Sequence, residues 1–190
     1  FVSKMDRENA DFERVMSSMT ETFGRRCVPI NIPIGAETSF SGIIDLLNPD
    51  ADSSDSANDL VNKTREQLTE AIAETDDNLA TKYLEGESIS TDELKAGLKK
   101  GVTNGTIVPV LVGSSTMNIG TKELMNAITD YMPSPEEIDP VTNISDEDSP
   151  MKCNPNGPLS ALIFNTTADP FVGKLSYFRV YSGTFKGDSQ

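Results

Sequence analysis

Two short segments of the sequence carry the side chains best suited to chemistry. They are "SKMD" at positions 3–6 and "VLVGSS" at positions 110–115. Each one ends a run predicted as a strand and precedes a run predicted as a helix. Ligands of open α/β sheets bind at the carboxyl ends of the strands, so we expect both loops to face one pocket.

The carboxylate of Asp6 offers the most specific chemistry in these loops. It can accept two hydrogen bonds from the N1–H and amino groups of guanine, while the stem of Lys4 lies along the base. Adenine lacks that pair of donors and would leave a buried carboxylate unpaired, which gives a discrimination of about 10⁴. A backbone N–H of "GSS" could meet the guanine O6. The alternative is that Lys-x-Asp forms only a solvated turn.

Composition excludes several other kinds of function. The chain has 30 acidic and 16 basic residues, a net charge of −14, and such a surface repels the phosphates of RNA. It contains no histidine, which excludes Ser/His and Cys/His nucleophile pairs. We therefore expect no direct RNA binding, no catalytic residue and no metal ligand on this chain.

The cysteines and the lengths of the apolar runs indicate where in the cell the protein is located. Cys27 and Cys153 lack the spacing of a zinc or redox motif, which favours free thiols in a reducing compartment. The longest apolar run, starting at Ile107, is far shorter than the ~20 residues of a membrane helix. These features predict a cytoplasmic protein that does not bind membranes.

Hydrophobic periodicity predicts an α/β protein with an inserted helical region. A helical stripe runs from Phe12 to Phe23, "CVPINIPIGA" and "SGIIDLL" are typical of strands, and "TIVPVLVGSS" is typical of a buried parallel strand. One long helical pattern extends from Leu60 to Tyr83, and Ser90 with Glu93 fits a capping box that begins another helix.

Changes in composition along the chain divide it into parts. Residues 1–47 and 106–133 are predicted to form one α/β unit, which residues 48–105 interrupt as an insertion. Residues 134–158 are rich in proline and acidic side chains, as linkers are. Residues 159–190 are predicted to contain strands, although two or three strands do not make a stable domain by themselves.

Six segments in this order resemble elongation factor G, the family of bacterial, ribosome-dependent translational GTPases. The segments are "KMDRENADFERV", "VPINIPIGAE", "SGIIDLL", "VPVLVGSS", "MNAITDYMPSP" and "DPFVGKLSYFRVYSGTFKGD". The resemblance spans nearly the whole chain and is weakest between about residues 48 and 82. It implies the C-terminal half of a P-loop GTPase-type domain with a mainly helical insertion, followed by the opening strands of a β-barrel domain, the second domain of the family.

The resemblance also implies roles for individual residues. Lys4 and Asp6 match the guanine-reading positions, and Ser114 and Ser115 match the second base-recognition loop. Ser3 stands where the family has asparagine, and Ser115 and Thr116 stand where alanine and leucine are common. These departures affect the expected affinity for guanine more than its selection, and they indicate a divergent paralogue.

The phosphate-binding pattern G-x-x-x-x-G-K-[ST] does not occur in the sequence. Phosphoryl transfer requires that cradle, a metal and a positioned water, so these 190 residues alone are expected to bind guanine nucleotides weakly and not to hydrolyse GTP. The parent protein would bind GTP or GDP with magnesium.

The resemblance implies the ribosome as partner, with the insertion at 48–105 contacting the stalk protein of the large subunit. A long acidic run from Asp50 to Asp77 could attract a basic partner, although it could equally be a solvated surface. Two other functions stay open: a ribosomal protection or peptide-release GTPase of the same superfamily, and a ribosome-associated adaptor without enzymatic activity.

Overall fold

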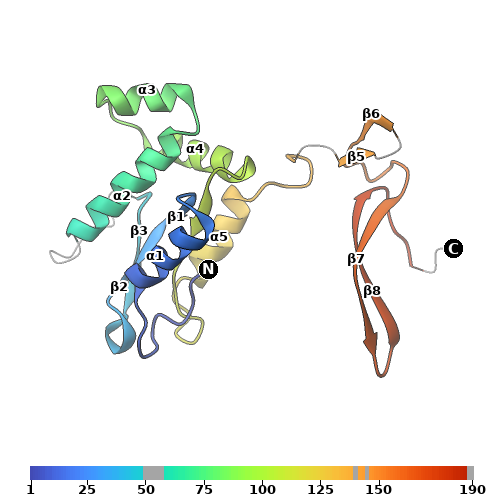
Figure 1. Ribbon diagram of the computed structural model, residues 1–190, viewed down its shortest axis with the longest axis horizontal. Helices are drawn as coiled ribbons and strands as arrows, with labels where there is room; N and C mark the ends of the chain where they lie inside the picture. The colour runs from blue at the N-terminus through green and yellow to red at the C-terminus, as the bar shows by residue number, and fades with distance from the viewer. Residues whose placement is uncertain (49–57, 139–140, 144–145, 188–190) are drawn as a thin grey trace. The chain divides into compact units, whose positions relative to one another are not determined.

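The computed structural model describes residues 1–48, 58–138, 141–143 and 146–187. The chain has a mixed α/β fold and divides into two compact units, Phe1–Met132 and Pro133–Gln190 (Figure 1). None of the helices in the described ranges combines the length and the apolar character needed to cross a membrane.

Parallel strand pairing organises the first unit, as the apolar run at 107–112 predicted, although Val108 of this run is exposed and the strand is not buried throughout. β1 (Cys27–Pro29) pairs in parallel with β4 (Val108–Val110). Just beyond β4, Val112 forms a parallel bridge with Val2. The N–H of Val2 donates to the Leu111 carbonyl at 2.7 Å, whereas the N–H of Ile30, directly after β1, donates to the Val110 carbonyl at 2.9 Å. Neighbouring residues of a strand bond to opposite sides, so the 108–113 segment lies between the N-terminal segment and β1.

The chain continues from β1 into an antiparallel hairpin. β2 (Asn31–Ile34) pairs with β3 (Gly42–Asp45), and a single turn of 3₁₀ helix, η1 (Glu37–Ser39), joins them. Gly35 opens this turn with φ +74°, and a Cβ there would lie 2.3 Å from the Ser39 carbonyl oxygen. Only glycine fits that backbone without strain.

Helices flank these strands, and the Phe12–Phe23 extent of α1 and the start of α4 agree with the sequence predictions. α1 (Phe12–Phe23) starts at Asp11, whose side chain accepts from the Arg14 N–H, and ends at Gly24. α4 (Thr91–Thr103) begins with the capping box of Ser90 and Glu93. α5 (Thr121–Tyr131) follows the last strand of this unit.

The helix predicted to run continuously from Leu60 to Tyr83 is broken in the structure. α2 (Asn58–Ala73) and α3 (Asp77–Glu85) are separate helices. The Asp76 side chain accepts from the Asn78 N–H at 2.9 Å and begins α3. Its other oxygen pairs with Lys100 on α4 at 2.7 Å, which fixes the break against the next helix. Periodicity alone does not show such a break, because both helices present apolar residues at similar spacing.

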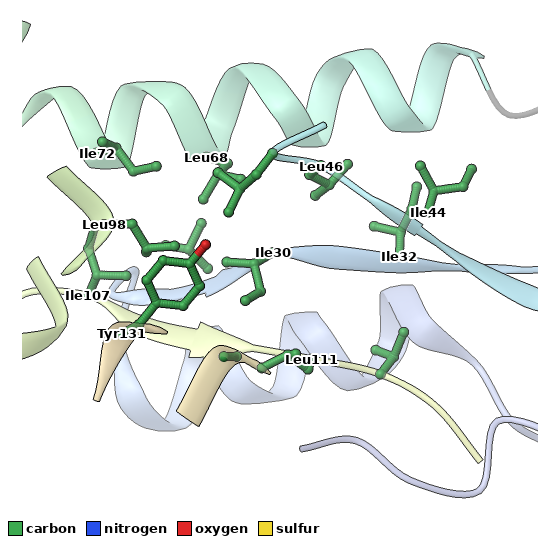
Figure 2. Packing of buried hydrophobic residues seen from close by; sticks show 14 of the residues in the cluster. Ile30, Ile32, Ile44, Leu46, Leu68, Ile72, Leu98, Ile107, Leu111 and Tyr131 are labelled. Carbon is green, nitrogen blue, oxygen red and sulfur yellow. The ribbon is translucent and has the colours of Figure 1, made fainter. Parts of the chain in front are cut away.

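The core of the first unit lies between α2 and the strands and continues on the opposite side under α1 and α5 (Figure 2). Leu68 and Ile72 of α2 point toward the strands, and Tyr131 of α5 lies near Leu98 and Ile107. Side chains from every helix of this unit and from the strands contribute buried apolar surface, which is the main favourable term in its stability. The most deeply buried members are Met5, Ile32, Leu46, Val61, Leu68, Ile72, Leu98, Val110 and Val112.

The second unit consists of two antiparallel pairs. β5 (Val141–Asn143) and β6 (Asp146–Met151) lie within the 134–158 range that composition predicted as a linker. β7 (Ser160–Asp169) and β8 (Gly173–Ser182) form a long hairpin. Its apolar side chains are largely exposed: Leu162, Ile163, Phe164, Phe171, Val172, Tyr177, Phe178 and Val180.

Candidate functional site

The two predicted ligand loops lie next to each other in the structure. The Gly113 N–H donates to the Val2 carbonyl at 3.0 Å, and the Met5 N–H donates to the Gly113 carbonyl at 3.2 Å. These bonds hold residues 2–5 alongside residues 111–113 and bring Asp6 to Ser114. The side chains that share this edge come from distant parts of the sequence, because parallel strands end at the same edge of a sheet.

Asp6 is a nearly buried, ionised carboxylate. Its side chain is 14% exposed, and Ser114 is fully buried. The Ser114 hydroxyl lowers the pKa of Asp6 most; burial opposes this, and the Asp6 backbone N–H and the charge of Arg7 lower it further. Arg7 Nε lies 3.7 Å from Oδ2. With a pKa below its ordinary value, this carboxyl accepts hydrogen bonds and donates none at neutral pH.

The second oxygen of this carboxylate is unsatisfied. Asp6 Oδ1 is buried and has no hydrogen-bond partner among the residues that the structure describes. The Ser114 hydroxyl lies close to this carboxylate, and its hydrogen bonding is the largest cause of the lowered pKa of Asp6. A buried acceptor without a donor costs about 1–3 kcal/mol. A ligand that supplies N–H donors would remove that cost.

The second loop is folded around Ser114 itself. Its N–H donates to the Ile119 carbonyl and its carbonyl accepts from the Ile119 N–H, both at 2.9 Å. Its hydroxyl accepts from the Met117 N–H at 3.2 Å. The backbone N–H of Ser114 is therefore engaged within the loop. The N–H that could meet a ligand oxygen is the next one, at the exposed Ser115.

The remaining predicted residues, Ser3 and Lys4, are exposed on the first loop. Lys4 has φ +68°, a left-handed conformation that is uncommon for a non-glycine residue. Within the described ranges, no hydrogen bond joins the side chains of Ser3, Lys4 or Ser115 to Asp6 or Ser114. The structure thus brings Asp6 and Ser114 together and leaves the other three at the surface around them.

Two residues that the sequence did not single out hold this site in place. The Glu37 N–H donates to the Met5 carbonyl at 2.9 Å, and Glu37 Oε1 accepts from the Asn9 N–H at 2.7 Å. Asn31 Oδ1 accepts from the Val112 N–H at 2.8 Å. Asn31 is a polar residue in an otherwise apolar strand, and this pattern could have indicated a buried hydrogen bond. Glu37 lies in a polar turn, so nothing in the sequence around it indicated such a role.

Two grooves lie on the first unit away from Asp6 and Ser114, although Asn9 and Glu37, which hold the Asp6 loop, line the first of them. One, of about 530 Å³, lies between the start of α1 and the β2–β3 turn, where Phe12 and Pro33 line it. The other, of about 400 Å³, is lined by Leu47, Tyr83 and Leu94. Asp6 and Ser114 line neither groove. In the described part of the chain, no three His, Cys, Asp or Glu side chains converge as metal ligands.

Comparison with solved structures shows a likeness that covers nearly the whole chain. No family model matches the chain. A solved crystal structure, that of the Thermus thermophilus protein ttk003000868, matches it with a TM-score of 0.70 and 28% sequence identity. The match covers 96% of this chain and 27% of that one, so the chain spans about a quarter of the length of the solved protein. The mixed α/β arrangement described above is therefore shared with part of a longer protein whose name states no activity.

Proposed function

We propose that this chain is the guanine-recognising part of a ribosome-dependent translational GTPase resembling elongation factor G. The observation that carries the proposal is the carboxylate of Asp6, which is nearly buried, ionised and unsatisfied at Oδ1, beside Ser114. It lies where two parallel segments end, which is where ligands bind in α/β sheets. The six sequence segments that resemble the family include both loops.

The geometry suits guanine better than adenine. The ionised Asp6 accepts from the N1–H and the amino group of guanine, and Oδ1 has capacity for one of these bonds. Adenine presents no such pair of donors and would leave the buried oxygen unsatisfied. The stem of Lys4 would lie along the base, the Ser115 N–H would meet O6, and Ser3 would border the site without the amide of the family asparagine.

The finer fold assignment is part of this proposal. The first unit would be the C-terminal half of a P-loop GTPase-type domain, with α2, α3 and α4 as its insertion. The second unit would supply the opening strands of a β-barrel. The exposed apolar side chains of β7 and β8 support this assignment, because an isolated two-stranded sheet is only marginally stable in water and gains stability from further strands.

The whole protein would bind GTP or GDP with magnesium and hydrolyse GTP in the cytoplasm, using phosphate-binding residues that do not belong to these 190 residues. Its partner would be the ribosome, with the insertion facing the stalk protein. The acidic residues proposed for that contact belong partly to the described helices, such as Glu66 and Glu70. Asp50, Asp52 and Asp55 lie outside the described residues.

A nucleoside titration followed by NMR tests the proposal at the level of this chain. Guanosine, GDP and adenosine are added separately to the ¹⁵N-labelled 190-residue protein. We expect guanosine and GDP to shift the amides of Asp6 and Ser115 with millimolar affinity, and adenosine to leave them unchanged. Equal shifts with adenosine, or shifts confined to other residues, would contradict the proposal.

Two substitutions make this titration specific. Asp6→Ala should abolish the guanosine response, because it removes both acceptors. Glu8→Ala is the matched control, since it removes an exposed carboxylate from the same loop. If Glu8→Ala weakened binding as much as Asp6→Ala, the response would reflect general charge and not the proposed hydrogen bonds.

A further inference from the structure

The loop that carries Asp6 is held at both of its ends by one residue of another element. The Glu37 N–H donates to the Met5 carbonyl at 2.9 Å, directly before Asp6. Glu37 Oε1 accepts from the Asn9 N–H at 2.7 Å, three residues after it. Glu37 belongs to η1, in the turn of the β2–β3 hairpin, and is separated from Asn9 by 28 positions in sequence.

The turn around Glu37 is itself closely constrained. Glu37 has φ +54°, and Gly35 packs too closely on the Ser39 carbonyl to accept a side chain. Ser39 Oγ donates to the Ala36 carbonyl at 2.7 Å and accepts from the Ala36 N–H at 3.1 Å. A residue held in such a conformation presents its N–H and carboxylate in fixed directions, since the surrounding bonds over-determine it.

The loop that Glu37 contacts has backbone strain of its own. Lys4 has φ +68° and Asn9 has φ +64°, both left-handed. Such residues return to ordinary conformations unless neighbouring contacts hold them. Glu37 contacts the loop beside both of these residues. Its N–H bonds to the backbone between Lys4 and Asp6, and its carboxylate bonds to the N–H of Asn9.

We propose that Glu37 is a positioning residue that fixes the Asp6 carboxylate for base recognition. The proposal rests on the function proposed above and adds the residue on which its geometry depends. Glu37 does not touch the base; it sets where Asp6 lies relative to Ser114 by holding the backbone on both sides. A site for hydrogen-bonded ligands requires positions accurate to about 0.5 Å, which an unsupported surface loop does not keep.

The test compares three substitutions in the 190-residue chain. Glu37→Ala removes the acceptor for the Asn9 N–H. Glu37→Gln keeps an oxygen acceptor of the same reach without the charge. Glu37→Gly also removes the acceptor but suits the left-handed backbone, so a shared effect of Glu37→Ala and Glu37→Gly reflects loss of the acceptor and not backbone strain. The backbone bond to Met5 is available in all three.

The first readout is the titration of Asp6 by ¹³Cγ NMR, which requires no nucleotide. Because Ser114 lowers the pKa of Asp6 in the native geometry, displacement of the loop should return it toward the ordinary value. We expect that change in Glu37→Ala and Glu37→Gly, and a wild-type titration in Glu37→Gln. Wild-type titrations in all of the variants would overturn the proposal.

The second readout is guanosine affinity, measured as above. We expect Glu37→Ala and Glu37→Gly to weaken it about tenfold and Glu37→Gln to retain it, as loss of one oriented contact implies. If guanosine bound every variant equally, Glu37 would not position Asp6 for the base. If the wild-type protein bound no guanosine, the proposed function would fail, while the Asp6 titration would still decide whether Glu37 fixes the loop.

Discussion

Asn31 and Val112 are joined by a buried hydrogen bond in which a side chain takes the place of the backbone. Asn31 Oδ1 accepts from the Val112 N–H at 2.8 Å. The Ile30 carbonyl, which could have continued the parallel ladder with this segment, instead accepts from the Leu46 N–H at 3.0 Å. Beyond Ile30 the chain therefore no longer pairs with β4 and pairs with β3. The Asn31 side chain still holds the segment that leads from β4 to Ser114.

Removing this acceptor should destabilise the first unit. Asn31→Ala leaves the buried Val112 N–H without a partner but also removes the buried Asn31 Nδ2, which has no partner among the described residues, so we expect a net loss of about 1 kcal/mol in the free energy of unfolding. Urea unfolding followed by circular dichroism measures the change. Asn78→Ala, at an exposed position, is the control and should change stability by no more than about 0.5 kcal/mol. Equal effects of the two substitutions would show that the Asn31 bond contributes nothing specific.

The base preference should follow the donors and acceptors of residue 6. Asp6→Asn replaces one acceptor oxygen by an amide donor, which suits the oxygen that xanthine carries in place of the guanine amino group. We expect weaker binding of guanosine and a preference for xanthosine, measured by competition between the two nucleosides. Unchanged selectivity would mean that Asp6 is only a turn residue.

Gly97 should resist substitution even though it lies within a helix. A Cβ there would lie 2.6 Å from Ile72 Cγ2 and 2.9 Å from Leu79 Cδ1. A β-branched side chain in a helix has one strongly preferred rotamer, so Ile72 of α2 cannot turn away. We expect overpacking in Gly97→Ala to lower the free energy of unfolding by about 1–3 kcal/mol. The higher helix propensity of alanine offsets about 1 kcal/mol of this loss.

Thermal and urea unfolding of Gly97→Ala measure the net change. In an Ile72→Val background Cγ2 is retained, so Gly97→Ala should lower the stability as much as it does in the wild type. In an Ile72→Ala background Cγ2 is absent, so Gly97→Ala should lower the stability less. A stabilised Gly97→Ala protein would show that α2 and α4 can separate without loss.

The contact between α3 and α4 should depend on pH below about 4.5. Hydrogen bonds from Lys82 and Ser90 lower the pKa of Glu93 from 4.5 to about 2. A lowered carboxyl pKa stabilises the folded state above the unfolded value, and this contribution is lost as pH falls from about 4.5 to about 2. Wild type should therefore exceed Glu93→Gln in stability near neutral pH, with the difference vanishing toward pH 2.

Chemical unfolding at a series of pH values measures this difference. The Glu93 side chain is 36% exposed, so added salt should reduce the effect. Lys82→Met removes the partner that lowers the Glu93 pKa most and should reproduce most of the Glu93→Gln change. A pH-independent difference between wild type and Glu93→Gln would show that the charge of Glu93 has no role in stability.

Local patterns in the sequence were sufficient for much of the fold. The capping box at Ser90 and Glu93, the Phe12–Phe23 extent of α1 and the parallel strand at 108–110 depend on short-range preferences that the sequence states directly. The adjacency of "SKMD" and "VLVGSS" followed from the rule for strand ends. What these patterns missed was the break at Asp76, because its cause includes Lys100 on another helix.

The supports of the candidate site were not predictable in the same way. Asn31 acts on Val112 and Glu37 acts on Met5 and Asn9, which are pairs formed only when distant segments meet. Asn31 stands out as a polar residue in an apolar strand, but no local preference shows which partner Asn31 or Glu37 will have. The unsatisfied Oδ1 of Asp6 is likewise a property of burial by the second loop, which a sequence motif does not express.

The long-range origin of the site has a consequence for the order in which the protein folds. The bond from Val112 to Asn31 joins residues 81 positions apart, and α2, α3 and α4 lie between them. Closing so long a loop costs chain entropy, and the cost is smaller once the intervening segment has already become compact. α2 contacts α3 and α4, the next two helices along the chain, and these contacts can form before α2 packs on the strands. Mutations that destabilise them would therefore slow assembly of the Asp6 site during refolding, although they lie outside it in the native protein.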